Sequence, residues 1–128
     1  MKRYHFDPEK GLIVLRARLW GPSGDARVRL ALDTGATSTI VSTPILVALG
    51  YDPVSSQERM RVTTASGVEF AARILAERIE VLGTTRQSFP ILCHTLPPST
   101  TVDGLLGLDF LRRQRLIFDF REGLVEVG

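Results

Sequence analysis

Alternating apolar and polar residues lead up to Asp33. Apolar side chains occupy every second position at Val28, Leu30 and Leu32. Because successive side chains of a strand point to opposite faces, this pattern predicts a half-buried strand over residues 26–32. Residues 12–20 are also strand-like, and Gly21-Pro22-Ser23-Gly24 between the two segments is a strong turn sequence. The two segments therefore predict a hairpin whose second strand ends at Asp33.

Strand-like segments continue through the rest of the chain. They cover residues 40–41, 60–64, 68–74, 74–81, 88–93, 105–107, 116–120 and 124–127. Two of these segments flank Ala65, Ser66 and Gly67, which predicts a β-hairpin with a tip of small residues. The last two flank Arg121-Glu122-Gly123 and predict a final hairpin.

Two short helices interrupt this series of strands. Thr43 can cap the first, which has Pro44 in its first turn and Gly50 placed to end it. The second is predicted over residues 109–113. Each helix follows a strand, so the arrangement of hairpin, strand and helix occurs roughly twice. The pattern indicates an all-β protein with two short helices, forming a single domain over residues 1–128.

Composition and charge fit an ordinary soluble domain. A length of 128 residues is enough for one hydrophobic core. The fractions of hydrophobic residues, 44%, and of charged residues, 23%, are ordinary for a globular domain. The formal net charge is +2, and the arginines are scattered or alternate along strands without forming a basic block. Nucleic acid is therefore not an expected partner.

The cysteine content and the N-terminal part of the sequence bear on the cellular location of the protein. Cys93 is the only cysteine, so no intrachain disulfide forms and a reducing compartment is allowed. The apolar run 12–15 is soon followed by Arg16 and Arg18, which argues against a signal peptide or a membrane span. We expect no membrane segment in this chain and a cytoplasmic location.

The stretch Asp33-Thr34-Gly35 carries the clearest candidate chemistry. An acid at the end of an apolar strand is costly to bury unless hydrogen-bond donors surround it. Gly35 lets backbone amides approach closely enough to act as such donors. Asp-x-Gly is also an ordinary turn sequence, so a purely structural β-domain in which Asp33 caps a turn is one interpretation.

Other catalytic or ligand-binding sets find little support in the sequence. Cys93 and His94 are adjacent, so in a strand they point to opposite faces and do not form a nucleophile-base pair. The chain has no Gly-x-Ser-x-Gly elbow and no phosphate-binding loop. Its histidines and cysteine lack metal-ligand spacing, and Asp103 and Asp109 lack an EF-hand register. No cofactor or metal is expected.

A second apolar segment, far downstream of the Asp33 stretch, helps to interpret that stretch. Leu30-Ala31-Leu32-Asp33-Thr34-Gly35-Ala36 is matched by Leu105-Leu106-Gly107, which runs into the predicted second helix. Together these segments resemble the motifs of the retropepsin-like aspartic proteases, over most of the chain from about Gly11 onward. The resemblance implies an all-β acid-protease half-barrel with two short helices and one active site per homodimer.

The resemblance also implies a mechanism. Such enzymes use two carboxylates that share one proton, and this chain has a single Asp-Thr-Gly. The second carboxylate is therefore expected from Asp33 of another copy, in a two-fold homodimer acting on an extended peptide. By resemblance, Thr34 links the two catalytic loops and Gly35 lends an amide to the carboxylate.

Two further sets of roles come from the same resemblance. Leu105, Leu106 and Gly107 are expected to support the catalytic loop, and Ala65, Ser66 and Gly67 to form a flap over the peptide. The chain departs from viral members at Thr37, where an acidic residue is common, and in its additional C-terminal hairpin. A catalytically silent dimeric binding module of the same fold is the alternative.

Overall fold

Strands make up most of the residues described by the computed structural model, which covers residues 2–64, 67–97 and 99–128. The elements are β1 Lys2–His5, β2 Val14–Gly21, β3 Gly24–Leu32, β4 Ile40–Val41, α1 Thr43–Ala48, the 3-10 turn η1 Pro53–Ser55, β5 Arg59–Thr64, β6 Gly67–Val81, β7 Thr84–Cys93, β8 Gly104–Leu106, α2 Leu108–Leu111, β9 Leu116–Asp119 and β10 Leu124–Val127. The expected all-β class with two short helices is confirmed.

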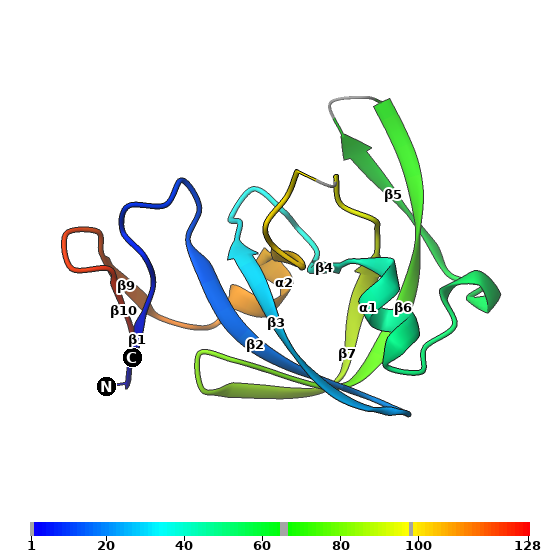
Figure 1. Ribbon diagram of the computed structural model, residues 1–128, viewed down its shortest axis with the longest axis horizontal. Helices are drawn as coiled ribbons and strands as arrows, with labels where there is room; N and C mark the ends of the chain where they lie inside the picture. Colours follow the sequence, from blue (N-terminus) through cyan, green and yellow to red (C-terminus); the bar gives the residue numbers. More distant parts are fainter. Residues whose placement is uncertain (1, 65–66, 98) are drawn as a thin grey trace.

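Six strands form a closed ring, in the order β2-β3-β8-β4-β7-β6 (Figure 1). The antiparallel pairing of β2 with β6 closes it, with Leu19 opposite Ile79. Two neighbouring pairs in the ring, β3 with β8 and β4 with β7, are parallel, and each joins segments that are far apart in the sequence. The ring is therefore a small barrel built mainly from long-range pairings.

Alternation along the strands fills the interior of this barrel. Leu19, Leu30, Ile79, Ile91 and Leu106 have no exposed surface and belong to one hydrophobic core. Helix α1 adds Leu46 to this core, and α2 adds Phe110, both also fully buried. Burial of apolar surface on this scale is the main favourable term in folding.

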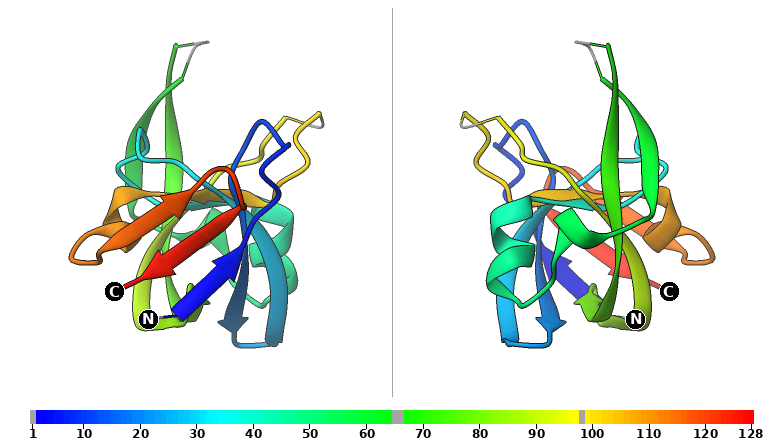
Figure 2. Two further views of the ribbon diagram at one scale, coloured as in Figure 1. Left: turned by 90° about the vertical axis from the view of Figure 1, so that its left-hand side faces the viewer. Right: turned by 90° about the vertical axis from the view of Figure 1, so that its right-hand side faces the viewer.

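A second sheet holds both ends of the chain. Its three antiparallel strands lie in the order β1-β10-β9 (Figure 2). The sequence analysis predicted β9 and β10 but not β1, because Lys2–His5 is polar and charged. Tyr4 is half-buried opposite Val125, and Val125 is completely buried, so the partner strand supplies the apolar anchor that β1 lacks.

Strand β6 runs unbroken from Gly67 to Val81, where two strands meeting at Ile74 were predicted. It pairs with β5 up to Ala72, with β7 from Ala72 onward and with β2 near its end. The predicted boundary therefore corresponds to a change of partner and not to a break in the strand. Helix α2 is shorter than predicted because the backbone turns extended at Arg112 and left-handed at Arg113.

Candidate active site

Asp33 follows the last residue of β3 and is fixed by the neighbouring parallel strand β8. Its backbone N–H donates to the carbonyl oxygen of Leu106 at 3.0 Å. Leu32, one residue earlier, lies directly opposite Leu106 in the strand register. The end of the first motif is therefore held by the second motif, as the shared hydrophobic pattern of the two segments suggests.

The carboxylate of Asp33 sits on a tight turn. The N–H of Gly35 donates to Asp33 Oδ1 at 2.8 Å, and the N–H of Ala36 donates to the Asp33 carbonyl at 3.1 Å. A Cβ atom added at Gly35 would lie 3.1 Å from the same Oδ1, so glycine keeps this approach open. Asp33 is half-buried, whereas Thr34 and Gly35 are exposed. The turn thus presents a carboxylate of which one oxygen already accepts a hydrogen bond from the backbone.

A buried threonine connects the two motif segments. The Oγ1 of Thr39 donates to Asp109 Oδ1 at 2.7 Å and accepts from the Gly107 N–H at 3.1 Å. The N–H of Thr39 donates to the other carboxylate oxygen of Asp109 at 3.0 Å. Thr39 has no exposed surface, so these bonds are shielded from water. Asp109 in turn lies in the first turn of α2.

Backbone contacts add to these bonds of Thr39, and we call the two sets together the brace of the Asp33 turn. The N–H of Leu108 donates to the Ala36 carbonyl at 2.8 Å, and the N–H of Asp109 donates to the Thr37 carbonyl at 3.2 Å. A Cβ atom on Gly107 would lie 2.6 Å from the carbonyl carbon of Ser38, so no side chain fits there. The loop after Asp33 therefore packs directly on the backbone that begins α2.

The sequence analysis named Leu105, Leu106 and Gly107 as loop support, and all three lie beside the Asp33 loop. It did not identify Thr39 or Asp109 as partners. Asp109 was considered only as a possible metal ligand, and the lack of an EF-hand register argued against that role. The available signal was its place in the first turn of a predicted helix, where acids are enriched because the helix dipole favours negative charge.

The hairpin of β5 and β6 stands above the barrel (Figure 2). Of the three residues predicted to form a flap tip, Ala65 and Ser66 lie outside the described residues. Gly67 begins β6 in the left-handed region, with φ of 130°. His94 Nε2 lies 2.6 Å from Glu69 Oε2 on the hairpin, which connects this arm to the end of β7.

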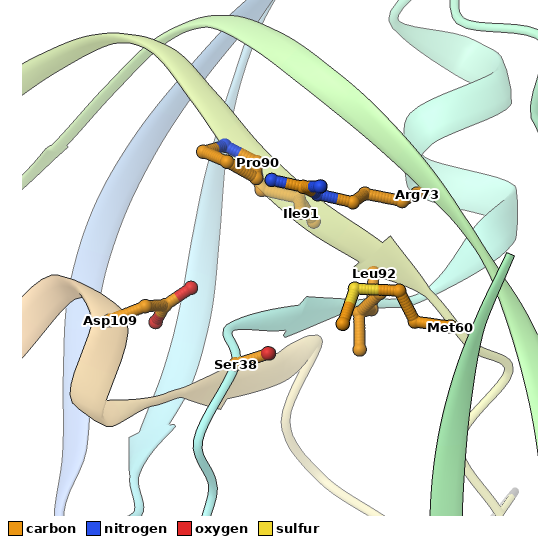
Figure 3. A pocket seen from close by; sticks show the side chains of 7 residues that line it. All are labelled: Ser38, Met60, Arg73, Pro90, Ile91, Leu92 and Asp109. Atoms are coloured by element: carbon orange, nitrogen blue, oxygen red, sulfur yellow. The ribbon is translucent and has the colours of Figure 1, made fainter. Parts of the chain in front are cut away.

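A cavity of about 190 Å³ opens between the hairpin and the motif segments. Figure 3 shows Met60 and Arg73 reaching toward it from the hairpin, Ser38 from the loop after Asp33, and Asp109 from α2. Its remaining lining comes from β7, at Pro90, Ile91 and Leu92. Asp33 does not line this cavity, so the cavity adjoins the candidate site without containing its carboxylate.

Competing chemistry has little support in the structure. Burial raises the pKa of the Cys93 thiol to about 11, so it is a poor nucleophile near neutral pH. Across residues 2–64, 67–97 and 99–128, no group of three or more His, Cys, Asp or Glu side chains is placed to hold a metal ion. In the same part of the chain, no helix has the length and apolar character needed to cross a membrane.

Comparisons with known proteins match the part of the chain that contains Asp33 and Gly107. The sequence profile of a family described as gag-polyprotein putative aspartyl protease matches residues 23–113, well over half of the chain. The chain is 30% identical over 102 residues to DNA damage-inducible protein 1 of Eremothecium gossypii. That alignment covers 79% of this chain but 21% of the relative, so the chain spans about a fifth of that protein.

A solved structure supports the fold. The chain resembles a retropepsin-like aspartic protease from Rickettsia conorii with a TM-score of 0.72, over 98% of this chain and 88% of that one. The sequence identity is 19%, so this likeness bears on the fold alone. With the profile match spanning both motifs, the chain belongs to the family of gag-polyprotein putative aspartyl proteases and has the retropepsin-like fold.

Proposed function

We propose that the protein is an aspartic endopeptidase that hydrolyses peptide bonds as a homodimer, with Asp33 of each subunit in one shared active site. The observation that carries this proposal is the braced Asp33 turn, which presents one carboxylate at the end of β3. The chain has a single Asp-Thr-Gly, and the chemistry needs two carboxylates. A closed two-fold dimer supplies the second.

The reaction divides the work between the two carboxylates. One takes a proton from a water molecule, whose oxygen then bonds to the carbonyl carbon of the substrate. The other is protonated and donates a hydrogen bond to the carbonyl oxygen, where negative charge develops. The first carboxyl then gives the proton that it took from water to the amide nitrogen, so that the carbon–nitrogen bond breaks and the amine and the new carboxylic acid are released.

The local hydrogen bonds suit this division. Oδ1 of Asp33 already accepts the Gly35 N–H, whereas no hydrogen bond to Oδ2 occurs among the described residues. Oδ2 is therefore the oxygen that we assign to water and to the shared proton. We assign Thr34, which is exposed beside Asp33, to contacts with the second copy across the dimer axis.

The β5–β6 hairpin is the proposed cover of the substrate. Val68 and Phe70 are 55% and 70% exposed on it, which gives the arm an exposed apolar surface. An extended peptide lying between this arm and the Asp33 turn would have main-chain groups to pair with and an apolar surface to contact. Ala65, Ser66 and Gly67 keep their assignment as the flap tip within this proposal.

Mixing subunits tests the shared site. Asp33→Asn nearly preserves the shape of the side chain but removes the base, so this variant is expected to fold, dimerise and fail to cleave. When variant and wild type are refolded together in equal amounts, about one quarter of the dimers carry two aspartates. With total protein fixed, activity should fall to about one quarter of that of the wild type.

Independent sites would give a different result. If each subunit carried its own complete site, the mixture would keep about one half of the activity, and that value would refute the shared site. Subunit exchange is verified by mass spectrometry. If pure wild type cleaves no peptide in a varied library at any pH between ~3 and ~8, the protein is instead a silent dimeric binding module of the same fold.

A further inference from the structure

Four arginines gather on the outer face of the β2–β3 hairpin. Arg16 lies directly opposite Arg29, and Arg18 lies directly opposite Arg27. All four are exposed, whereas the residues between them point into the core. In the sequence these arginines merely alternate along two strands, and only the strand register brings them together as one arginine face.

Acidic neighbours neutralise only part of this face. Arg18 Nε pairs with Asp25 at 2.8 Å, and within the described residues none of the other three forms an ion pair. Asp103 accepts the backbone N–H of Arg29 at 2.8 Å and not its guanidinium. Glu80 of β6, opposite Arg18, accepts a hydrogen bond from Thr85 at 3.1 Å. Like charges directly opposite each other destabilise a sheet, so an anion lying across this face would relieve a built-in repulsion.

The surroundings of the arginine face limit what can bind there. Trp20, at one end of it, is already contacted by the guanidinium groups of Arg18 and Arg78, 4.8 and 4.4 Å from the ring centroid. The ring is therefore not a free platform on which a nucleic-acid base could stack. Strand β8 pairs with β3 only at Leu30–Leu32, and β6 pairs with β2 only at Ala17–Trp20. The feature of this face that distinguishes one class of ligand from another is therefore its guanidinium side chains.

Charge and spacing favour an acidic peptide. Guanidinium groups match carboxylates with two parallel hydrogen bonds. An extended peptide with acidic residues at alternate positions repeats about every 6.6–6.8 Å, which is also the spacing of Arg27 and Arg29 along their strand. We propose that the arginine face is a docking site for an acidic, extended segment of a polypeptide substrate, outside the catalytic site. The assignment of that segment to a substrate rests on the proposed function.

Binding to the inactive protein tests this proposal apart from catalysis. The Asp33→Asn protein is titrated into a fluorescein-labelled twelve-residue peptide of alternating Glu and Thr, and fluorescence anisotropy is measured at low salt. Arg16→Gln/Arg29→Gln should weaken binding about fivefold. The matched control, Lys10→Gln/Arg121→Gln, removes the same charge from exposed positions elsewhere and should change binding less than twofold.

Two further measurements make the result decisive. The arginine double variant should unfold in urea at the same or a higher concentration than the parent, because it removes a like-charge pair; a lower midpoint would mean that these arginines are structural. Equal weakening by both double variants would reduce the effect to net charge and overturn the proposal. So would tighter, arginine-dependent binding to a twelve-nucleotide RNA or to vesicles containing phosphatidylserine.

Discussion

Single residues fix the position of the candidate catalytic carboxylate. Thr39 uses its hydroxyl both as a donor to Asp109 and as an acceptor from the Gly107 N–H, and it is fully buried. A buried donor or acceptor that loses its partner costs more than the mean value of a hydrogen bond. Thr39 is therefore the residue at which a one-atom change should most disturb the Asp33 turn.

Replacing this hydroxyl gives a sharp prediction. Thr39→Val keeps the side-chain shape but leaves the Gly107 N–H and one Asp109 oxygen without this partner, so we expect a loss of about 1–3 kcal/mol in the free energy of unfolding. Thr39→Ser retains the hydroxyl and should lose clearly less. Urea denaturation measures both, and a loss for Thr39→Ser as large as that for Thr39→Val would contradict a dominant role of the hydroxyl.

At the level of this site, the sequence predicted the Asp33 turn but not its brace. The turn follows from local residues, since an apolar strand, an acid and a glycine lie within a few positions. The bond between Thr39 and Asp109 joins residues 70 positions apart, and no local pattern encodes such a pairing. The short, polar β1 was missed for a related reason, because its apolar contact comes from Val125.

Among the elements, β6 organises the barrel by pairing with three different strands. Its inward side chains, including Ile79, are buried, and Ile79 lies opposite Leu19 where β2 closes the ring. From the sequence, residues 68–74 and 74–81 were predicted as two strands, without an assignment of their inward face. The pairing of β6 with β2, which closes the barrel, was not predictable, because the alternation of apolar and polar residues along a strand does not reveal which strand lies beside it.

The core position of Leu19, where β2 and β6 close the barrel, can be tested by comparing it with an exposed leucine of β6. Leu19 is fully buried on β2, whereas Leu75 is 58% exposed on β6. Leu19→Ala should reduce the free energy of unfolding by about 2–5 kcal/mol, since it leaves a cavity in the core. Leu75→Ala should change it by about 0.5 kcal/mol or less. Similar losses in chemical denaturation would argue that the barrel interior lies elsewhere.

For the whole molecule, the proposed dimer makes activity depend on one shared proton. Two carboxylates held close together do not both ionise readily, so the pair retains a proton that is lost as the pH rises. At very low pH both bind protons and neither can act as the base. We therefore expect kcat/KM to pass through a maximum on the acidic side of neutrality.

Peptide cleavage measured from pH ~3 to pH ~10 checks this expectation, with the dimer verified by light scattering at each pH. Asp33→Asn protein at the same concentrations controls for contaminating peptidases. A rate that is still climbing above pH ~9 would exclude a carboxylate pair, because the ordinary pKa of aspartate is about 3.9 and shifts rarely exceed 5 units.

The long sequence separation between Thr39 and Asp109 also determines when the loop after Asp33 gains its support from α2. During synthesis, Thr39 leaves the ribosome 70 residues before its partner Asp109. At ordinary elongation rates this interval is roughly 4 to 14 s. A nascent chain therefore carries the candidate catalytic Asp33 without this support until nearly the whole domain has emerged. Under the proposed function, the order of translation by itself delays proteolysis until the domain can fold and find its partner.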